Sequence, residues 1–208
     1  DRDDLSVLIA FASETGLPLQ IIGGGANILV ADAGIRGLVV DLSSLCTVTR
    51  RGDSLVAEAG ASISSVSERA ALERLSGLEF IYAMPGSTGG AIWMNARCYG
   101  RSISEVLEWI EYADGDGNPG RLDMPHSGFS YKRSPFQGSG RTVYRASFAL
   151  STGNEGEIRT EMDRVYADRK AKGHFDYPSA GSVFKNDRSL GKPTGVLLDE
   201  LGLKGSRM

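Results

Sequence analysis

Apolar positions near the N-terminus recur at helical spacing. Leu5, Leu8, Ile9 and Ala12 share one helical face, acidic residues precede them, and Gly16 follows. This arrangement predicts an amphipathic helix, because acidic residues favour a helix start and glycine favours a helix end. Its apolar residues are expected to pack in the hydrophobic core rather than to form part of a functional site.

Short apolar runs between turn residues predict the next elements. Strands are expected at Leu19–Ile22, Gly37–Leu42 and Ser54–Glu58. A helix is expected over Ile63–Leu75, with Gly77 beyond its end. These pieces indicate a small α/β unit at the start of the chain.

The second half of the chain continues this alternation. Val106–Ala113 and Gly120–Asp123 predict two strands around the tight turn Asp114–Asn118, and Arg141–Leu150 predicts another strand. We interpret Ser151–Gly156 as a linker. The remaining pattern predicts two helices, one that carries Ile158, Met162, Val165 and Tyr166, and one over Pro193–Leu201 that Gly202 stops.

Composition narrows the fold class and the partners. The chain has 208 residues, of which 41% are hydrophobic and 24% are charged, as in a globular protein of one or two domains. Its 27 glycines favour a turn-rich α/β or α+β chain over a helix bundle. The net charge is −3 without a basic stripe, so nucleic-acid binding is not expected.

Further classes of function find no support in the sequence. Cys46 and Cys98 stand apart, which favours buried free thiols over a disulfide, and His126 and His174 lack the spacing of metal ligands, so no metal site is expected. The sequence has neither an apolar run of about 18 residues nor a signal peptide. We therefore expect a cytoplasmic protein without membrane contact.

The segment Ala83–Ala96 combines a proline, three glycines, two hydroxyls and an amide before it becomes apolar. Glycine lets a backbone approach a bound group closely, and consecutive uncovered N–H groups form a concavity that binds anions. The segment therefore predicts a loop for a phosphate-bearing ligand. A tight turn with close packing is the alternative.

A second glycine loop follows the predicted strand Leu19–Ile22. Gly23, Gly24 and Gly25 precede another apolar run at Ile28–Val30, for which we expect a short buried element. Two such loops suit a long ligand with a pyrophosphate. Neither loop has the GxxxxGK[ST] or the GxGxxG pattern, so a P-loop and a Rossmann fold are not supported.

Ser182, within Pro178–Asn186, is a candidate for chemistry. No GxSxG elbow surrounds it and neither histidine has the context of a triad base, so an acyl nucleophile is not expected. A serine hydroxyl is still able to protonate a strongly basic carbanion or enolate, because that transfer is downhill. A solvated or capping serine is the alternative.

Two adjacent cations, Lys132 and Arg133, lie between aromatic residues in Tyr131–Phe136. A cation at this position is suited to bind a substrate carboxylate and to stabilise charge that grows on it in the transition state. Ordinary surface charge is the alternative.

Four segments together resemble a known family. Gly23–Val30 resembles G-x-G-S-N-L-L, Gly77–Phe80 with Met84–Ala96 resembles G-L-E-F…I-P-G-T-V-G-G-A…M-N-A-G, Tyr131–Phe136 resembles Y-R-x-S-x-F, and Ala180–Asn186 resembles A-G-S-x-F-K-N. In order and spacing they resemble the UDP-N-acetylenolpyruvoylglucosamine reductases (MurB), in the subgroup without an extra tyrosine-bearing loop.

The resemblance implies an α+β fold, the FAD-binding fold shared with vanillyl-alcohol oxidase. It implies two FAD-binding subdomains over residues 1–80 and 81–150, and part of a substrate-binding domain over residues 151–208. Both ends of the family's sequence, including a catalytic glutamate, are expected to lie outside this chain.

The resemblance also implies a reaction. NADPH reduces FAD, a hydride passes to C3 of UDP-N-acetylglucosamine enolpyruvate, and protonation at C2 gives UDP-N-acetylmuramate for peptidoglycan synthesis. FAD and NADPH are the implied cofactors, and a cytoplasmic monomer is expected. The alternatives are another FAD-dependent oxidoreductase of the same fold and a non-catalytic nucleotide-binding remnant.

The matching motifs imply site residues. Ser182 takes the place of the proton donor, and Lys132, with Arg133 as the alternative, takes the place of a catalytic arginine. Lysine keeps the charge but lacks the planar fork of donors. Ala26 and Arg97 stand where the family pattern has serine and glycine. The implied substrate contacts are Tyr131, Lys170, Lys172, Lys185 and Asn186. The implied cofactor contacts are Gly23, Gly24, Gly25, Ala26, Asn27, Ile28, Pro85, Gly86, Ser87, Thr88, Gly89, Gly90, Asn95 and Arg97.

Overall fold

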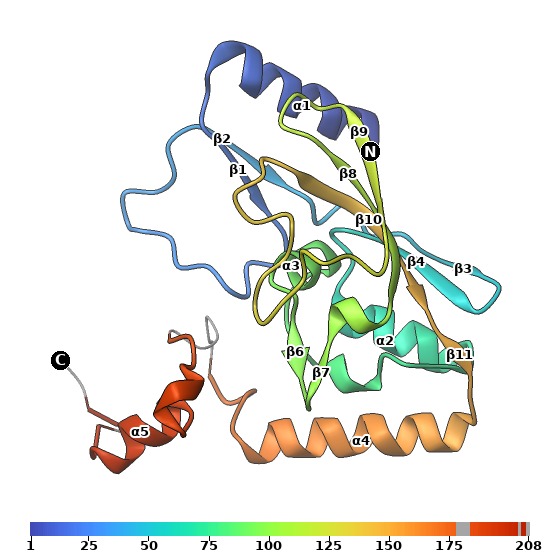
Figure 1. Ribbon diagram of the computed structural model, residues 1–208, viewed down its shortest axis with the longest axis vertical. Helices are drawn as coiled ribbons and strands as arrows, with labels where there is room; N and C mark the ends of the chain where they lie inside the picture. The colour runs from blue at the N-terminus through green and yellow to red at the C-terminus, as the bar shows by residue number, and fades with distance from the viewer. Residues whose placement is uncertain (178–183, 204, 207–208) are drawn as a thin grey trace.

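An antiparallel sheet of five strands forms the centre of the computed structural model, which describes residues 1–177, 184–203 and 205–206 (Figure 1). The strand order is β3-β4-β10-β8-β9. Strand β10 is central, because it pairs with β4 on one side and with β8 on the other. The strands are β3 (Val48–Arg51), β4 (Ser54–Glu58), β8 (Leu107–Ala113), β9 (Pro119–Asp123) and β10 (Thr142–Ala149).

A separate parallel pair of strands precedes this sheet in the chain. β1 (Leu19–Ile22) pairs with β2 (Leu38–Asp41). The N-terminal helix α1 (Arg2–Thr15) begins at the N-cap Asp1 and ends at Gly16, whose φ is 66°. Glycine adopts this left-handed conformation without steric cost. The predicted apolar face is confirmed for Leu5, Ile9 and Ala12, which are buried, but the prediction is wrong for Leu8, which is exposed.

Two helices pack against strands β4 and β10 of the sheet. They are α2 (Ile63–Leu72) and α3 (Thr88–Trp93). Ile63 and Ile92 are fully buried and join one apolar cluster with residues of the sheet. Burial of one such side chain stabilises the fold by about 1.5–3 kcal/mol. The glycine-rich segment that leads into α3 is therefore anchored to the core at its C-terminal side.

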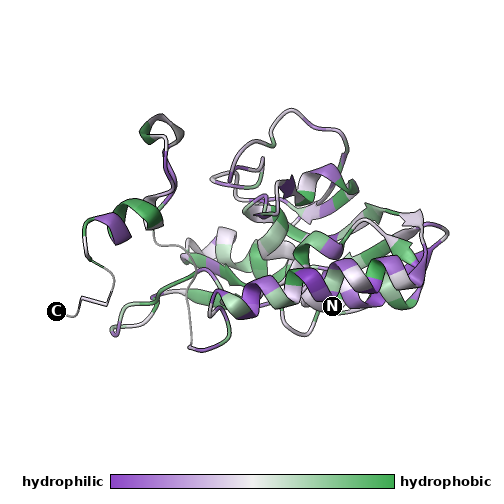
Figure 2. Ribbon diagram, turned by 90° about the horizontal axis from the view of Figure 1, so that it is seen from below, coloured by the Kyte–Doolittle hydropathy of each residue, from purple (hydrophilic) through white to green (hydrophobic). Residues whose placement is uncertain are grey.

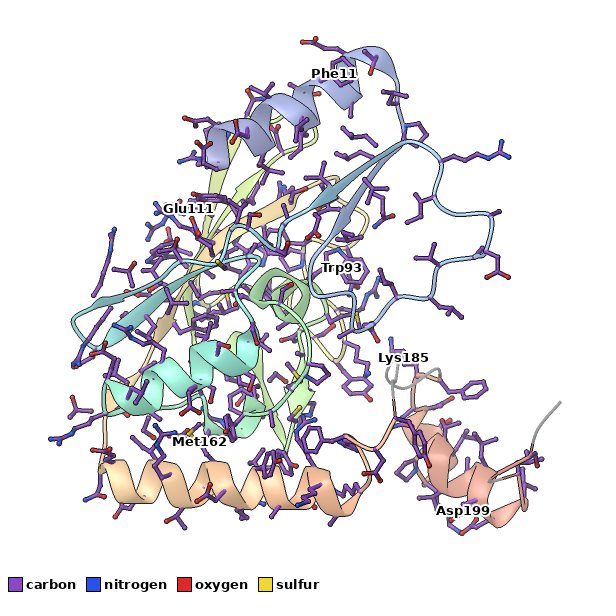
Figure 3. The ribbon with its side chains drawn as sticks, turned by 180° about the vertical axis from the view of Figure 1, so that it is seen from behind. Phe11, Trp93, Glu111, Met162, Lys185 and Asp199 are labelled. Carbon is purple, nitrogen blue, oxygen red and sulfur yellow. The ribbon has the colours of Figure 1, made fainter. Side chains whose placement is uncertain are left out.

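The long helix α4 (Glu155–Ala171) packs along α2 and the 3-10 turn Glu79–Ile81. Its inner face buries Ile158 and Met162, and Met162 lies between α4 and α2 (Figure 3). Helix α4 thus packs directly against elements from the first half of the chain.

The interpretation of Ser151–Gly156 as a linker is wrong. Strand β11 (Ser151–Thr152) pairs with β5 (Leu75–Ser76), and α4 begins at Glu155 with Asn154 as its N-cap. The sheet also draws strands from residues on both sides of position 80. The division into three domains stays a prediction.

A short hairpin connects α3 to the rest of the second half. Its strands are β6 (Arg97–Cys98) and β7 (Arg101–Ser102), and it extends toward α4 (Figure 1). Helix α5 (Thr194–Glu200) has no buried residue and stands apart from the sheet and its helices (Figure 2). Across the described ranges, no helix has the length and apolarity to cross a bilayer.

Several element predictions are confirmed and others need correction. The strands at 19–22, 54–58 and 120–123 and the last helix occur as expected, whereas the helix predicted over Ile63–Leu75 ends at Leu72. Strands β3, β6 and β7 were not predicted. The buried element expected at Ile28–Val30 is wrong, because Leu29 is 93% exposed in a loop. Cys46 is a free but exposed thiol, not a buried one.

Candidate cofactor and substrate site

The two glycine-rich loops lie against each other. A Cβ atom on Gly24 would lie 2.9 Å from the Cα atom of Gly86, and a Cβ atom on Gly23 would lie 2.1 Å from the Oγ atom of Ser87. Gly24 has no room for a side chain, because backbone atoms of Gly86 occupy the space, and a side chain on Gly23 would require the Ser87 side chain to move. The two segments that the sequence assigned to one long ligand are therefore in contact.

Several main-chain N–H groups at this junction have no acceptor among the described residues. Those of Gly24, Gly25, Gly86 and Ser87 donate no hydrogen bond within the described part of the chain. Gly25 and Gly86 have φ angles of 64° and 107°, which residues with a side chain rarely adopt. Unpaired N–H groups gathered in such turns are suited to bind an anion.

The next three N–H groups are engaged within the protein. Those of Thr88 and Gly89 donate to the carbonyls of Ala61 and Ala59, each at 2.8 Å, and that of Gly90 donates to the hydroxyl that caps α3, at 3.3 Å. The Thr88 hydroxyl donates to the same Ala61 carbonyl at 2.9 Å. The expectation of an uncovered run is wrong for these residues, which anchor α3 instead.

The remaining loop residues surround the junction. Ala26 packs beside it, since a Cβ atom on Gly86 would lie 3.4 Å from that of Ala26. Pro85, Asn27 and Ile28 are exposed next to it. Their side chains are open to solvent or to a ligand.

Lys132 occupies the corner of a tight turn. Ser130 and Arg133 exchange two main-chain hydrogen bonds of 3.1 and 3.0 Å around it, and its φ is 53°. This left-handed conformation costs a residue with a side chain about 1–2 kcal/mol, and such strain gathers at functional sites. The buried Asn95 donates its amide to the Ser130 carbonyl at 2.8 Å, and Gln137 donates to the Lys132 carbonyl at 3.2 Å.

A pocket of about 550 Å³ opens beside this turn. Tyr131 and Lys132 line it from the turn, Arg97 lines it from β6, and Asn186 lines it from the segment before α5. The Asn186 side-chain oxygen accepts the N–H of Thr194 at 2.9 Å. The cations in its wall suit an anionic ligand.

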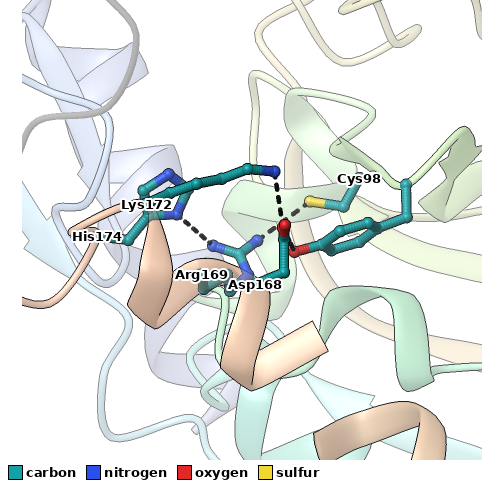
Figure 4. A pocket seen from close by; sticks show the side chains of 6 residues that line it. Cys98, Asp168, Arg169, Lys172 and His174 are labelled. Carbon is teal, nitrogen blue, oxygen red and sulfur yellow. Dashed lines mark hydrogen bonds and ion pairs between the residues drawn. The ribbon is translucent and has the colours of Figure 1, made fainter. Parts of the chain in front are cut away.

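A second pocket of about 350 Å³ lies between the β6–β7 hairpin and the end of α4 (Figure 4). The Tyr99 hydroxyl donates to Asp168 at 2.7 Å, and Lys172 donates to the same carboxylate at 2.7 Å. Burial and this hydrogen bond raise the pKa of Tyr99 to about 12. Lys172 and, to a smaller extent, Tyr99 hold the pKa of Asp168 below its usual value.

Arg169 is the buried cation of this second pocket. It is 7% exposed, donates to the Cys98 sulfur at 3.3 Å, and lies 3.5 Å from the Nδ1 atom of His174. Its Nε atom has no partner among the described residues. Burial raises the pKa of the Cys98 thiol, and the guanidinium of Arg169 acts in the opposite direction.

Sequence reasoning missed this cluster. It treated Cys98 and His174 as isolated residues, because the contact between Cys98 and Arg169 joins positions 71 residues apart. No local pattern marks Arg169 or Tyr99, so only the position of α4 on the hairpin reveals them.

Known proteins match the chain along nearly its whole length. The family profile of the FAD binding domain matches residues 1–123. The UDP-N-acetylenolpyruvoylglucosamine reductase of Caldanaerobacter subterraneus subsp. tengcongensis is 43% identical over 98% of this chain and 67% of its own length. The chain belongs to the UDP-N-acetylenolpyruvoylglucosamine reductase family. The protein of that name from Lactiplantibacillus plantarum is 40% identical over 99% of this chain and 67% of its own length.

The fold agrees with a solved member of the reductase family. The crystal structure of UDP-N-acetylenolpyruvylglucosamine reductase from Thermus caldophilus has a TM-score of 0.84 and 31% identity, and it covers 100% of this chain and 73% of that one. The predictions of an α+β FAD-binding fold and of an FAD-dependent oxidoreductase are confirmed. The chain spans about two thirds of the length of the two curated relatives named above.

The junction of the two loops fits the diphosphate of FAD. The contact of Gly24 with Gly86 brings the two loops together, so that their backbone groups lie side by side. The unpaired N–H groups supply donors for phosphate oxygens without requiring a cation.

Other predicted residues are distributed around the two pockets. Lys172 lines the second pocket, whereas Lys170 and Lys185 are exposed and line neither pocket. Arg133 is exposed at the end of its turn. Ser182 lies outside the described residues. Asn95, predicted as a cofactor contact, uses its side-chain amide on protein groups, the Ser130 carbonyl and the Ser104 N–H.

Proposed function

We propose that this chain forms the cofactor-binding part of an NADPH-dependent reductase that converts UDP-N-acetylglucosamine enolpyruvate to UDP-N-acetylmuramate. The observation that carries the proposal is the contact between two glycine loops in which the N–H groups of Gly24, Gly25, Gly86 and Ser87 donate to no described residue. The name shared by the relatives supports the substrate. We further propose a cytoplasmic monomer that binds neither nucleic acid nor a membrane.

The cofactor is held by main-chain groups in this proposal. Gly24, Gly25, Gly86 and Ser87 donate their N–H groups to the diphosphate, and Asn27 extends from the same junction. FAD, when bound, accepts a hydride from NADPH and supplies it to the enolpyruvyl double bond. The protein's part is to hold the reactants in line and to exclude water.

Lys132 provides the positive charge for the reacting group. Its ammonium group balances the substrate carboxylate and the negative charge that develops on the enolate. The charge acts beside a pocket whose wall also carries the cation of Arg97, and the two positive charges together attract an anionic substrate. Arg133 is exposed and does not line that pocket, so Lys132 is the better candidate.

Ser182 completes the reaction by giving its hydroxyl proton to C2 after hydride has reached C3. Tyr131, Asn186 and Lys172 hold the substrate in this proposal, because they line the two pockets. Lys170 and Lys185 are proposed as further contacts to its charged groups.

The visible spectrum of the purified protein tests the proposed function. We expect flavin absorbance, bleaching on addition of NADPH, and recovery on addition of UDP-N-acetylglucosamine enolpyruvate. A colourless protein that takes up no added FAD rejects the cofactor assignment. Bleaching without recovery points instead to an FAD-dependent oxidoreductase with another substrate.

A further inference from the structure

Gln137 links the end of helix α3 to the turn that carries Lys132. Its Nε2 atom donates to the carbonyl of Trp93, the last residue of α3, at 2.9 Å and to the carbonyl of Lys132 at 3.2 Å. A side-chain amide nitrogen has two hydrogens, so both of its donors are used. The Ser134 hydroxyl also donates to the Trp93 carbonyl, at 2.8 Å, so this helix end has a second partner.

The turn needs such support because its geometry is strained. Lys132 has a φ of 53°, a conformation that persists only where the surroundings impose it. Within the described part of the chain, the Lys132 carbonyl accepts a hydrogen bond from Gln137 alone. Asn95 holds the Ser130 carbonyl on the other side of the turn at 2.8 Å. Two side-chain amides therefore hold the turn from both sides.

We propose that Gln137 is a positioning residue that acts through Lys132. By binding the Lys132 carbonyl it fixes the left-handed turn and so aims the ammonium group into the neighbouring pocket. The inference rests on the proposed role of Lys132 and adds the residue that imposes its orientation. Gln137 lies directly after the Tyr131–Phe136 motif, and no sequence pattern singled it out.

The first test is the substitution Gln137→Met in the FAD-loaded holoenzyme. Methionine keeps the length of the side chain and removes both donors. Flavin absorbance and flavin reduction by NADPH should stay unchanged, while reoxidation by the enolpyruvyl substrate in a single turnover should slow about 10- to 100-fold. In a Lys132→Ala background the same substitution should slow reoxidation no further, because its effect passes through Lys132.

A second readout reports the turn itself. The Arg133 N–H donates to the Ser130 carbonyl across the turn at 3.0 Å, so its hydrogen exchange measures how firmly the turn is closed. Gln137→Met should speed this exchange. Ser139→Ala is the matched control, because its hydroxyl donates to the Phe136 carbonyl and accepts the Arg141 N–H, and forms no hydrogen bond with the described residues of the turn. The control should change neither exchange nor reoxidation.

A second variant, on the opposite side of the turn, tests the inference independently if Gln137→Met does not fold. Asn95→Asp removes the donor to Ser130 and keeps the oxygen that accepts the Ser104 N–H. It should also speed exchange at Arg133 and slow reoxidation.

The outcomes separate the inference from the proposed function. Unchanged exchange, or fast exchange with normal reoxidation while Lys132→Ala is slow, overturns the role of Gln137 alone. Normal reoxidation in Lys132→Ala overturns the proposed role of Lys132 and, with it, the catalytic part of this inference.

Discussion

Steric exclusion defines the role of Gly24 at the junction of the loops. In Gly24→Ala the new methyl group would lie 2.9 Å from the backbone of Gly86, and a backbone atom is unable to rotate away as a side-chain end does. The loops must separate, so we expect the affinity for FAD to fall by at least about tenfold, which is 1.4 kcal/mol. Titration of the apoprotein with FAD, followed by flavin fluorescence, measures the change.

Gly115→Ala supplies the control for that substitution. A Cβ atom on Gly115 would meet nothing within 4 Å, so its affinity for FAD should equal that of the parent protein. Equal affinities in all three proteins would show that the junction does not hold the cofactor.

The neighbouring cations Lys132 and Arg133 should differ in their effect on turnover. Lys132 lines the pocket from a strained turn, whereas Arg133 is exposed. We expect Lys132→Ala to lower kcat about 100-fold or more, as loss of an electrostatic stabiliser does. Arg133→Ala should change kcat less than threefold, which steady-state kinetics will determine. A larger loss in Arg133→Ala would move the cationic role to that residue.

At the scale of elements, the packing of α4 against α2 should contribute to the stability of the whole fold. Met162 is 1% exposed in a cluster with Ala71 of α2. Met162→Ala should lower the free energy of unfolding by about 2–5 kcal/mol, because it leaves a cavity between the two helices. Urea unfolding measured by circular dichroism tests this value.

An exposed neighbour on α4 serves as the comparison. Asp163→Ala should change the free energy of unfolding by less than about 0.5 kcal/mol. If residues 151–208 formed a unit of their own, Met162→Ala would leave the main unfolding transition where it is in the parent protein.

The contact between the β6–β7 hairpin and α4 should depend on pH at the alkaline end. Burial and the bond to Asp168 raise the pKa of Tyr99 to about 12. The folded protein then binds the phenolic proton more tightly than the unfolded chain, in which tyrosine titrates near pH 10. This contribution to stability is complete below about pH 10 and is lost as pH rises toward about 12.

Tyr99→Phe removes that group and provides the measurement. The variant should melt at a lower temperature than the parent protein at pH 7, and the difference should shrink between about pH 10 and about pH 12. Melting curves followed by circular dichroism over this range are sufficient. A constant difference across the range would contradict the assigned titration.

For the whole molecule, local patterns predicted much of the fold but little of its long-range pairing. The helical face of Leu5, Ile9 and Ala12 was readable because its period is set by local geometry. Strand β3 was missed, since its residues are largely exposed and its partner β4 determines its structure. The pairing of β5 with β11 likewise joins segments far apart in the sequence, so no local sequence pattern predicts it.

The candidate site shows the same limit. Glycine content predicted two phosphate-binding loops, and their contact through Gly24 and Gly86 agrees with a single ligand. The pattern did not predict which N–H groups remain unpaired, because the carbonyls of Ala59 and Ala61 occupy those of Gly89 and Thr88. The pattern also gave no sign of Gln137 and Arg169, because their hydrogen bonds are tertiary contacts.

The most direct test of the central claim is a crystal structure of the protein with FAD bound. The account predicts that oxygens of the diphosphate lie within about 3.2 Å of the main-chain nitrogens of Gly24, Gly25, Gly86 and Ser87. A diphosphate bound elsewhere, with those four N–H groups facing water, would contradict it.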